Sequence, residues 1–334
     1  MTSVRHAPLA LAASVLLTLP VAAQTAASHY HVVGRIVVGT THADFIVADP
    51  VNRRLYGLGN TVVDMDQDKV VDSIPGEPAG GYALGTDIGV GLSRTGTLFD
   101  LKTAHVLGHI NGQGDGSVYD PTTRRAFLFG RNYPRRRDDT AKVTDDTATV
   151  VDLHTLQVIG RRHFAQGFES AVADGKGMVF VNREDSSVLT KIDARTLKLV
   201  ARYPIPQCKR AAGLSMDRAH RRLFLGCDKE MVVVNADNGH VVTRIPVSGL
   251  ADENAFDPGT QLAFSANAPD STLTIVHEDT PDKYTVVDVV KTGGASRSVA
   301  VDERTHKVYP FYYVAGADPK DYRTYVLTAA VLAP

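Results

Sequence analysis

Acidic side chains recur in this chain at one position of a repeated pattern, five residues before each of a series of spaced aspartates. That position holds Asp44, Tyr82, Asp115, Glu169, Ala212, Asp252 and Arg297. Carboxylates that converge on one point can hold a hard cation such as Ca²⁺ through oxygen ligands. A crowded carboxylate can also gain a raised pKa and act as a general acid or base.

Other polar residues lie beside this position in the same segments and would join the same site. They are His42, Arg210, Glu253 and Asn254. With Arg210 and Arg297, the site would suit a small polar or anionic ligand instead of a metal. The remaining alternative is an ordinary solvated loop, where acidic residues are common. Asp252 and Glu169 are the preferred candidates within the set.

Basic residues occur in pairs elsewhere in the repeat and suggest a second kind of surface. The pairs are Arg53-Arg54, Arg124-Arg125 and Arg221-Arg222, with His306-Lys307 near the C-terminus. If the repeat places them on one face, they could contact the phosphates of DNA or another polyanion. Alternatively, the arginine stems cover apolar surface and their charged heads are solvated.

Several catalytic signatures are missing from the chain. It has no G-x-S-x-G elbow, no C-x-x-C-H haem attachment, no phosphate-binding loop and no H-E-x-x-H. The formal net charge of −1 over 334 residues gives no overall bias toward nucleic acid or an anionic membrane. Whether the protein is an enzyme stays open, and the missing signatures favour a role without catalysis.

The spaced aspartates belong to a repeat that predicts the fold. Asp-Pro-x-x-Arg-Arg-Leu-Tyr at 49–56 returns as Asp-Pro-x-x-Arg-Arg-Ala-Phe at 120–127 and as Asp-x-x-x-Arg-Arg-Leu-Phe at 217–224. The repeat spacing is about 40 residues, and each repeat contains four strand-like runs, which indicates a β-propeller. Seven repeats are anchored at Asp49, Asp87, Asp120, Asp174, Asp217, Asp257 and Asp302.

The two ends of the chain explain how the ring would close. The last repeat lacks a fourth strand, whereas residues 30–39 resemble a fourth strand with no blade before it. We therefore expect an all-β, seven-bladed propeller of four antiparallel strands per blade, with the N-terminal strand completing the last blade and removing an open edge. A charged insertion at 133–147 is either a functional lid or tolerated surface.

The N-terminus predicts export. A short basic segment, an apolar run over 9–21 and an Ala-x-Ala-like signal before Gln24 are typical of a secretory signal peptide at 1–23. Residues 24–334 would then form one domain in the periplasm or outside the cell. No other apolar run is long enough to span a membrane, and we expect a monomer.

The only two cysteines, Cys208 and Cys227, would lie in an oxidising compartment. They lie on either side of a predicted hairpin whose turn is at 217–220. Their positions are within a small register offset of residues that would face each other across that hairpin. Two alternatives remain at this stage, a cross-strand disulfide or two separate buried thiols.

Four segments give the chain a family resemblance. They are Arg-Leu-Phe-Leu-Gly-Cys at 222–227, Val-Val-Val-Asn-Ala-Asp-Asn-Gly at 232–239, Asn-Ala-Phe-Asp-Pro-Gly at 254–259 and Leu-Thr-Ile-Val-His-Glu-Asp-Thr-Pro-Asp-Lys at 273–283. With them the mature chain resembles the YncE-like, YVTN-repeat β-propeller family. The resemblance implies an exported seven-bladed propeller. Family members have been linked to DNA binding, and related propellers include lactonases and cofactor- or metal-handling proteins.

In a propeller the inner strands line a central channel, and the loops that enter these strands meet at the channel mouth. These observations favour a binding module that takes a small ligand, a metal such as Ca²⁺, or a protein partner at the channel mouth or on one face. The first alternative is a metal-dependent hydrolase of lactonase type, with Glu169, Asp252 and Asn254 among the ligands and water as the nucleophile. The second is DNA or polyanion binding through the arginine-rich turns. The identity of the ligand and of the partner is not predicted by the sequence.

Overall fold

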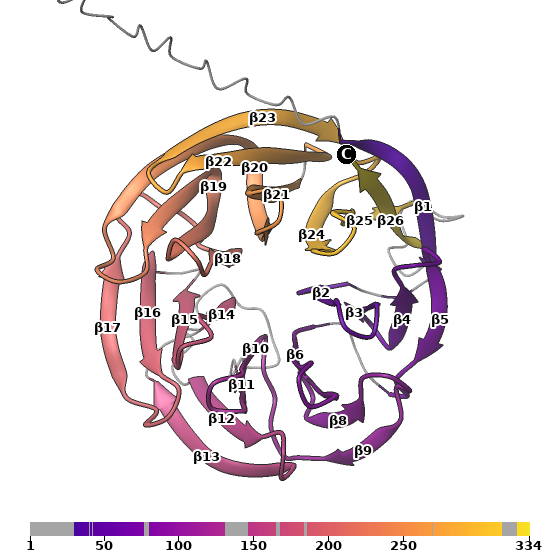
Figure 1. Cartoon of the computed structure of the whole chain (residues 1–334), viewed down its shortest axis with the longest axis vertical. Helices are drawn as coiled ribbons and strands as arrows, with labels where there is room; N and C mark the ends of the chain where they lie inside the picture. The colour runs from indigo at the N-terminus through magenta and orange to yellow at the C-terminus, as the bar shows by residue number, and fades with distance from the viewer. Residues whose placement is uncertain are drawn as a thin grey trace, which may run out of the picture.

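The strands form a ring of antiparallel sheets around a central axis (Figure 1). The computed structural model describes residues 30–39, 41, 43–76, 80–130, 146–164, 168–183, 186–268, 270–315 and 326–334, without the side chains of Asp146, Ala251 and Asp252. The predicted signal peptide and residues 133–145 of the predicted insertion lie outside this description. None of the described residues forms a helix long and apolar enough to cross a bilayer.

The first four blades are separate four-stranded sheets. Blade one contains β2 (Val47–Asp49), β3 (Arg54–Leu58), β4 (Thr61–Asp64) and β5 (Lys69–Ser73). Blade two contains β6 (Tyr82–Gly85), β7 (Val90–Ser93), β8 (Thr97–Asp100) and β9 (Val106–His109). Blade three contains β10 (Gly116–Asp120), β11 (Arg125–Phe129), β12 (Asp146–Asp152) and β13 (Gln157–Phe164). Blade four contains β14 (Ala171–Ala173), β15 (Met178–Arg183), β16 (Val188–Asp193) and β17 (Leu199–Pro204).

Blades five and six form one continuous sheet because the long strand β20 runs through both. Its members are β18 (Leu214–Asp217), β19 (Arg222–Asn235), β20 (Val241–Asp257), β21 (Leu262–Ala268), β22 (Thr272–Thr280) and β23 (Lys283–Lys291). β19 folds back on itself near Lys229, whose φ is 62°. The two ends of the strand therefore lie side by side, and Ala236 N donates to Arg221 O at 3.0 Å. The first half of β20 pairs with β19 and its second half with β21, so the sheet supplies two four-stranded blades.

The seventh blade closes the ring as the sequence predicts. It contains β24 (Ser296–Val301), β25 (Val308–Val314), β26 (Val326–Ala333) and, at its outer edge, β1 (His31–Gly39). β1 pairs with β26 from His31 opposite Ala333 to Gly39 opposite Leu327. The architecture is therefore a seven-bladed, all-β propeller, and the expectation that the N-terminal strand completes the last blade is confirmed.

The repeated aspartates explain why each blade turns after its inner strand. Asp49 accepts hydrogen bonds from the backbone N–H groups of Val51 and Asn52, at 2.9 and 3.1 Å. An Asp that caps its own turn in this way favours a tight connection. The turn then passes through a residue with positive φ, such as Arg53 at 62° or Arg221 at 59°.

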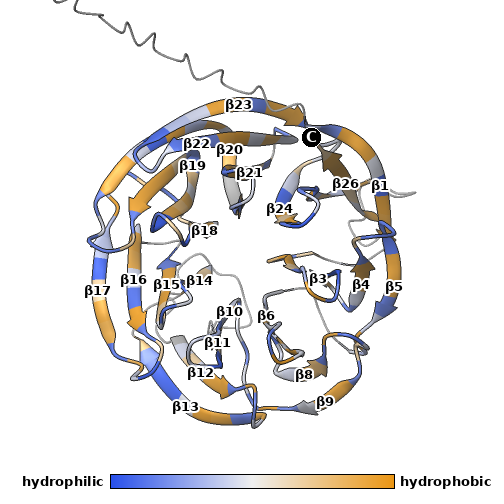
Figure 2. Cartoon of the chain, viewed as in Figure 1, coloured by the Kyte–Doolittle hydropathy of each residue, from blue (hydrophilic) through white to orange (hydrophobic). Residues whose placement is uncertain are grey.

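The core lies between neighbouring blades and not inside any one sheet. Between blades one and two, for example, the rings of Tyr56, Tyr82 and Phe99 pack with centroids 5.3 to 5.8 Å apart. The strands at the rim are more exposed, and Figure 2 shows apolar and polar stretches alternating along them. Burial between blades thus leaves only the two faces, the rim and the central channel for contacts with other molecules.

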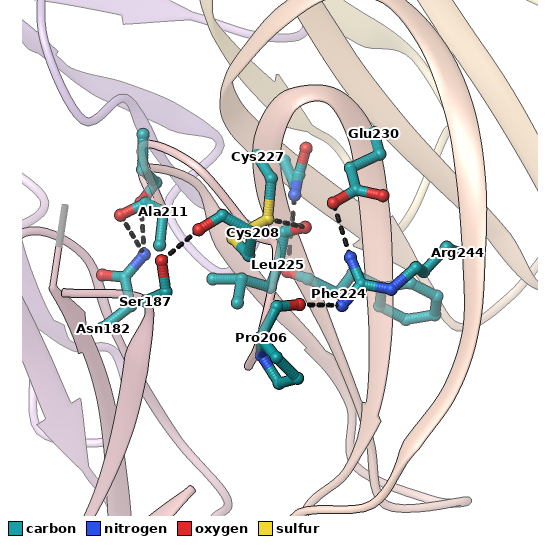
Figure 3. The surroundings of a disulfide bond; sticks show 12 residues. Asn182, Ser187, Pro206, Cys208, Ala211, Phe224, Leu225, Cys227, Glu230 and Arg244 are labelled. Atoms are coloured by element: carbon teal, nitrogen blue, oxygen red, sulfur yellow. Dashed lines mark hydrogen bonds and ion pairs between the residues drawn. A yellow bond between two sulfur atoms is a disulfide. The ribbon is translucent and has the colours of Figure 1, made fainter. Parts of the chain in front are cut away.

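A disulfide joins Cys208 and Cys227, the first of the two alternatives left open by the sequence. Cys208 precedes β18, and Cys227 lies on β19, so the bond fastens the entry segment of blade five to its own hairpin (Figure 3). The same segment is held to blade four by Asn182, whose Nδ2 donates to Ala211 O at 3.0 Å and Ala212 O at 2.7 Å.

Candidate functional site

The inner strands of all seven blades line a central cavity. Its volume is about 120 Å³. The lining comprises Phe45, Ile46, Val47, Gly81, Gly116, Ser117, Ser170, Ala171, Leu214, Glu253, Asn254 and Val299. The loops that enter the inner strands therefore meet at one end of this channel, as the repeat predicts.

A second cavity at the channel mouth brings together four of the predicted site residues. It measures about 140 Å³ and is lined by Ala43, Asp44, Phe45, Glu169, Glu253, Arg297, Ser298 and Tyr313. Three carboxylates and one guanidinium from blades one, four, six and seven therefore converge on one space. Tyr313 was not singled out from the sequence, because it lies on the second strand of blade seven and not in the segment before the first strand.

Glycines allow the loops of successive blades to come this close. A Cβ on Gly116 would lie 2.4 Å from Glu169 O, and one on Gly81 would lie 2.5 Å from Asp115 O. A Cβ on Gly213 would lie 2.9 Å from the Cα of Glu253. Each of these acidic residues thus rests with its backbone against a glycine of the preceding blade, which fixes its place around the mouth.

Two side chains at the mouth are held by backbone groups. Glu253 is 8% exposed, and its Oε2 accepts a hydrogen bond from Val299 N of the next blade at 3.0 Å. The Tyr313 hydroxyl accepts a hydrogen bond from Ala43 N at 2.8 Å. Burial raises the pKa of Tyr313, and the nearby Asp44 adds to the rise while Arg297 opposes it.

Phe45 has an unusual backbone conformation at this point. Its φ is 47°, in the left-handed region that bulky residues rarely adopt. Asp44 N donates to Gly57 O at 3.1 Å, and a Cβ on Gly57 would lie 2.8 Å from Phe45 O. Strained residues of this kind cluster at functional sites, so Phe45 is a further reason to regard the mouth as the candidate site.

A bulge in β20 lies beside the mouth in blade six. Between Ala251 and Glu253, the pairing of β20 with β21 shifts by one residue. Glu253 lines the cavity, and the side chain of Asp252, the residue given by counting from the repeat, lies outside the description. The amide of Asn254 fits best with Oδ1 accepting from Gly226 N at 2.9 Å and Nδ2 donating to Glu253 O at 3.1 Å, which commits it to the backbone.

The remaining candidates lie apart from the mouth cavity or outside the description. Asp115 forms an ion pair with Arg94 at 3.0 Å, and Arg94 was not foreseen because blade two lacks the usual repeat. Arg210 is exposed and lines neither cavity. His42 lies outside the described residues.

The predicted basic face is largely neutralised by acidic partners and carbonyl groups. Arg53, which is only 7% exposed, forms ion pairs with Asp302 and Asp66. Arg221 is bound in the same way by Asp174 and Asp237.

The other arginines of the set are bound mostly in the same manner. Arg54 pairs with Asp64, and Arg222 pairs with Asp282. Arg125 donates to the backbone O atoms of Ala194 and Arg195, and Arg124 is exposed. The turns therefore present little unbalanced positive charge to a polyanion, because most guanidinium groups bind the protein itself.

The lactonase alternative needs a group of metal ligands, with Glu169, Asp252 and Asn254 as the candidates. Among the described residues, three or more His, Cys, Asp or Glu ligand atoms come within 4.8 Å of one another at a single place, away from the mouth, at Asp217, His220 and Glu278. The Asn254 amide is bound to the backbone, as described above. The side chain of Asp252, the candidate ligand next to it, lies outside the described residues.

Comparison with known proteins supports the fold and goes no further. No family model matches the chain, and no curated protein matches it in sequence. Among solved structures, one match is a chain in the crystal structure of the mitotic checkpoint complex, with a TM-score of 0.70 and 11% identity. The match covers 97% of this chain and 99% of that chain. The chain is thus a β-propeller, in agreement with the sheets described above.

Proposed function

We propose that this protein is an exported, YncE-like interaction module that binds a partner protein by receiving a basic side chain at its channel mouth. The observation that carries the proposal is the lining of the mouth cavity, where the described residues comprise three carboxylates, Asp44, Glu169 and Glu253, and one guanidinium, Arg297. The formal charges of these four side chains sum to −2. Carboxylates around a confined space focus the field and attract a cation.

The shape of the site agrees with this charge. The cavity of about 140 Å³ is too small for a folded element and suits one side chain or a small cationic group. Its walls are held by backbone contacts, at Glu253 with Val299 N and at Tyr313 with Ala43 N. A rigid, preformed pocket loses little conformational entropy when its ligand binds.

Export rests on separate support. The N-terminal segment has the pattern of a signal peptide, and the disulfide between Cys208 and Cys227 is of a kind that persists in oxidising compartments. Fractionation of cells and N-terminal sequencing of the mature protein test this part. We expect a periplasmic or secreted protein that begins at Gln24, and a cytoplasmic protein with an intact leader would contradict it.

The binding proposal is tested with an array of short peptides that differ only in carrying Arg, Lys, Gln or Glu at a central position. Affinities for the unmodified protein are compared with those for the double variant Asp44→Asn/Glu169→Gln. Asp72→Asn/Asp270→Asn, which removes two exposed carboxylates away from the mouth, is the matched control.

We expect the protein to prefer peptides that carry Arg or Lys. The mouth variant should lose that preference, and the control should keep it. Equal binding by the two variants, or a preference for Glu peptides, would contradict the proposed role of the mouth. Loss of binding in high salt is expected as well, because the interaction depends on charge.

A further inference from the structure

One buried position of the repeat departs from the others in blade six. Six blades share a backbone hydrogen bond near the end of the third strand. A residue at or just after that end donates its N–H to a carbonyl O in the turn between the first and second strands, and the accepting residue has positive φ. In five of these blades the donor is an apolar residue no more than 1% exposed. They are Met65, Leu101, Leu153, Ala194 and Ala236. In blade six the donor is Glu278, bonded to Gln261 O at 2.9 Å and 4% exposed.

A second departure from the repeat faces Glu278, in the turn between the first and second strands of blade five. The third residue after the anchoring aspartate is Thr123, Thr260 or Thr305 in three blades, and each threonine hydroxyl donates to its aspartate. After Asp217 the same place is taken by His220. Its Nδ1 lies 2.6 Å from Asp217 Oδ2 and 3.2 Å from Glu278 Oε1.

A third departure from the repeat removes a basic side chain that would otherwise reach Asp217 from blade six. In three blades, the residue with positive φ reaches back to the anchoring aspartate of the preceding blade. These contacts are Arg53 with Asp302, Arg221 with Asp174 and His306 with Asp257. Blade six has Gln261 at this position, and its side chain donates to Pro258 O at 2.7 Å. Asp217 therefore lacks the basic partner from the following blade that Asp302, Asp174 and Asp257 have.

The three changes create a buried group of metal-ligand type. One ligand atom each from Asp217, His220 and Glu278 lies within 4.8 Å of the other two. The side chains of Asp217 and Glu278 are 1% exposed, whereas that of His220 is 42% exposed and opens the group to solvent. Neither carboxylate oxygen of Glu278 has a hydrogen-bond partner. A buried carboxylate without such a partner is costly unless a cation or a proton balances it.

Two basic side chains act on Glu278, and both are shared with other groups. His220 Nδ1 faces Glu278 Oε1 at 3.2 Å but lies closer to Asp217 Oδ2, at 2.6 Å. The N–H groups of Arg222 donate to Pro281 O at 2.7 Å, Asp282 Oδ1 at 2.8 Å and His220 O at 2.8 Å. Burial raises the pKa of Glu278 to about 7, and the adjacent Asp217 adds to the rise. Two buried carboxylates therefore share one imidazole between blades five and six, an arrangement that a bound cation would balance.

We propose that Asp217, His220 and Glu278 bind a divalent transition-metal ion of the Zn²⁺ type, which fastens blade five to blade six where the repeated ion pair is missing. An imidazole nitrogen with two carboxylate oxygens is a ligand set that suits Zn²⁺, at about 2.0–2.2 Å from the metal. Water from the exposed side of His220 would complete the coordination. The site is separate from the channel mouth and independent of the function proposed there.

The repeat itself provides variants that should fold. Glu278→Ala installs the residue that blades four and five carry at this position, and His220→Thr installs the residue of three other turns. His240→Thr, at an exposed histidine elsewhere in blade five, is the matched control. The mature protein and the three variants are freed of metal and titrated with Zn²⁺ by calorimetry. Their thermal melts are recorded with Zn²⁺, Ca²⁺, Mg²⁺ or EDTA.

We expect one Zn²⁺ per chain and a melting temperature that rises with Zn²⁺ in the unmodified protein and in His240→Thr. Glu278→Ala and His220→Thr should melt at the same temperature with Zn²⁺ and with EDTA. Loss of a ligand should weaken binding by more than the about 10–100-fold that loss of an outer-sphere partner costs. No Zn²⁺ binding would overturn the proposal and leave a proton shared by the carboxylates. A response to Ca²⁺ or Mg²⁺ alone, or equal Zn²⁺ binding by all variants, would also overturn it.

Discussion

The ion pair between Arg53 and Asp302 should be one of the strongest contacts between blades, and Arg53→Met tests it. It joins blade one to blade seven, next to the point where the ring closes. The guanidinium contacts both carboxylate oxygens at 2.5 Å, and the exposed fractions of the two side chains are 8% and 0%. Burial would raise the pKa of Asp302, but the hydrogen bonds from Arg53 and Thr305 outweigh it and lower the pKa.

The expected magnitude follows from that burial. Removing one partner of a buried pair leaves an uncompensated charge and costs about 3–5 kcal/mol. The adjacent Arg54 gives a matched control, since its pair with Asp64 lies within one blade and its side chain is 25% exposed. Arg54→Met should cost about 0.2–1 kcal/mol, as partly exposed pairs do.

Urea unfolding followed by circular dichroism measures both losses. The double variant Arg53→Met/Asp302→Asn should recover part of the stability lost in Arg53→Met, because no buried charge then lacks a partner. Equal losses in Arg53→Met and Arg54→Met, or no recovery in the double variant, would refute the view that this pair holds the ring closed.

Two further predictions concern pH and redox state. Because the folded-state pKa of Asp302 lies below its ordinary value, its contribution to stability is complete above the unfolded pKa of about 4. It is lost as the pH falls through the folded-state pKa, so acid unfolding of Arg53→Met should show a weaker pH dependence than that of the parent protein. The disulfide closes a loop with a sequence separation of 19 residues, so Cys208→Ala/Cys227→Ala should lose about 3 kcal/mol. Thermal melts with and without reductant check this, and an unchanged melting temperature would contradict it.

The sequence predicted the ring well because its signal is repeated. Six of the seven anchoring aspartates cap their own turns, so positions such as Asp49 and Asp217 report local geometry that depends on few distant contacts. The likeness between residues 30–39 and a fourth strand was also sufficient to predict the closure with β26. Local chemistry repeated along the chain can thus be recognised without knowledge of the tertiary structure.

The site was less predictable because it depends on contacts between blades. Counting from the anchors gave Asp252 with Glu253 beside it, and it did not reveal the bulge in β20 next to which Glu253 lines the mouth. The arginine pairs indicated a basic surface until the structure showed carboxylates of other segments beside them, as with Arg53 and Asp302. The group formed by Asp217, His220 and Glu278 could not be predicted from the sequence. Glu278 stands out only when the equivalent buried positions of six blades are matched, and the backbone hydrogen bonds of the structure are what match them.

The most direct test of the channel mouth as the binding surface is site-specific photo-crosslinking in the native cells. A photoreactive amino acid replaces the exposed Arg297 at the mouth or, as the control, Val200 on the outer strand of blade four. We predict a discrete adduct from position 297 and none from position 200. The adduct should disappear when Asp44→Asn/Glu169→Gln is added. An adduct from the outer strand alone, or one unaffected by loss of the two carboxylates, would contradict the account.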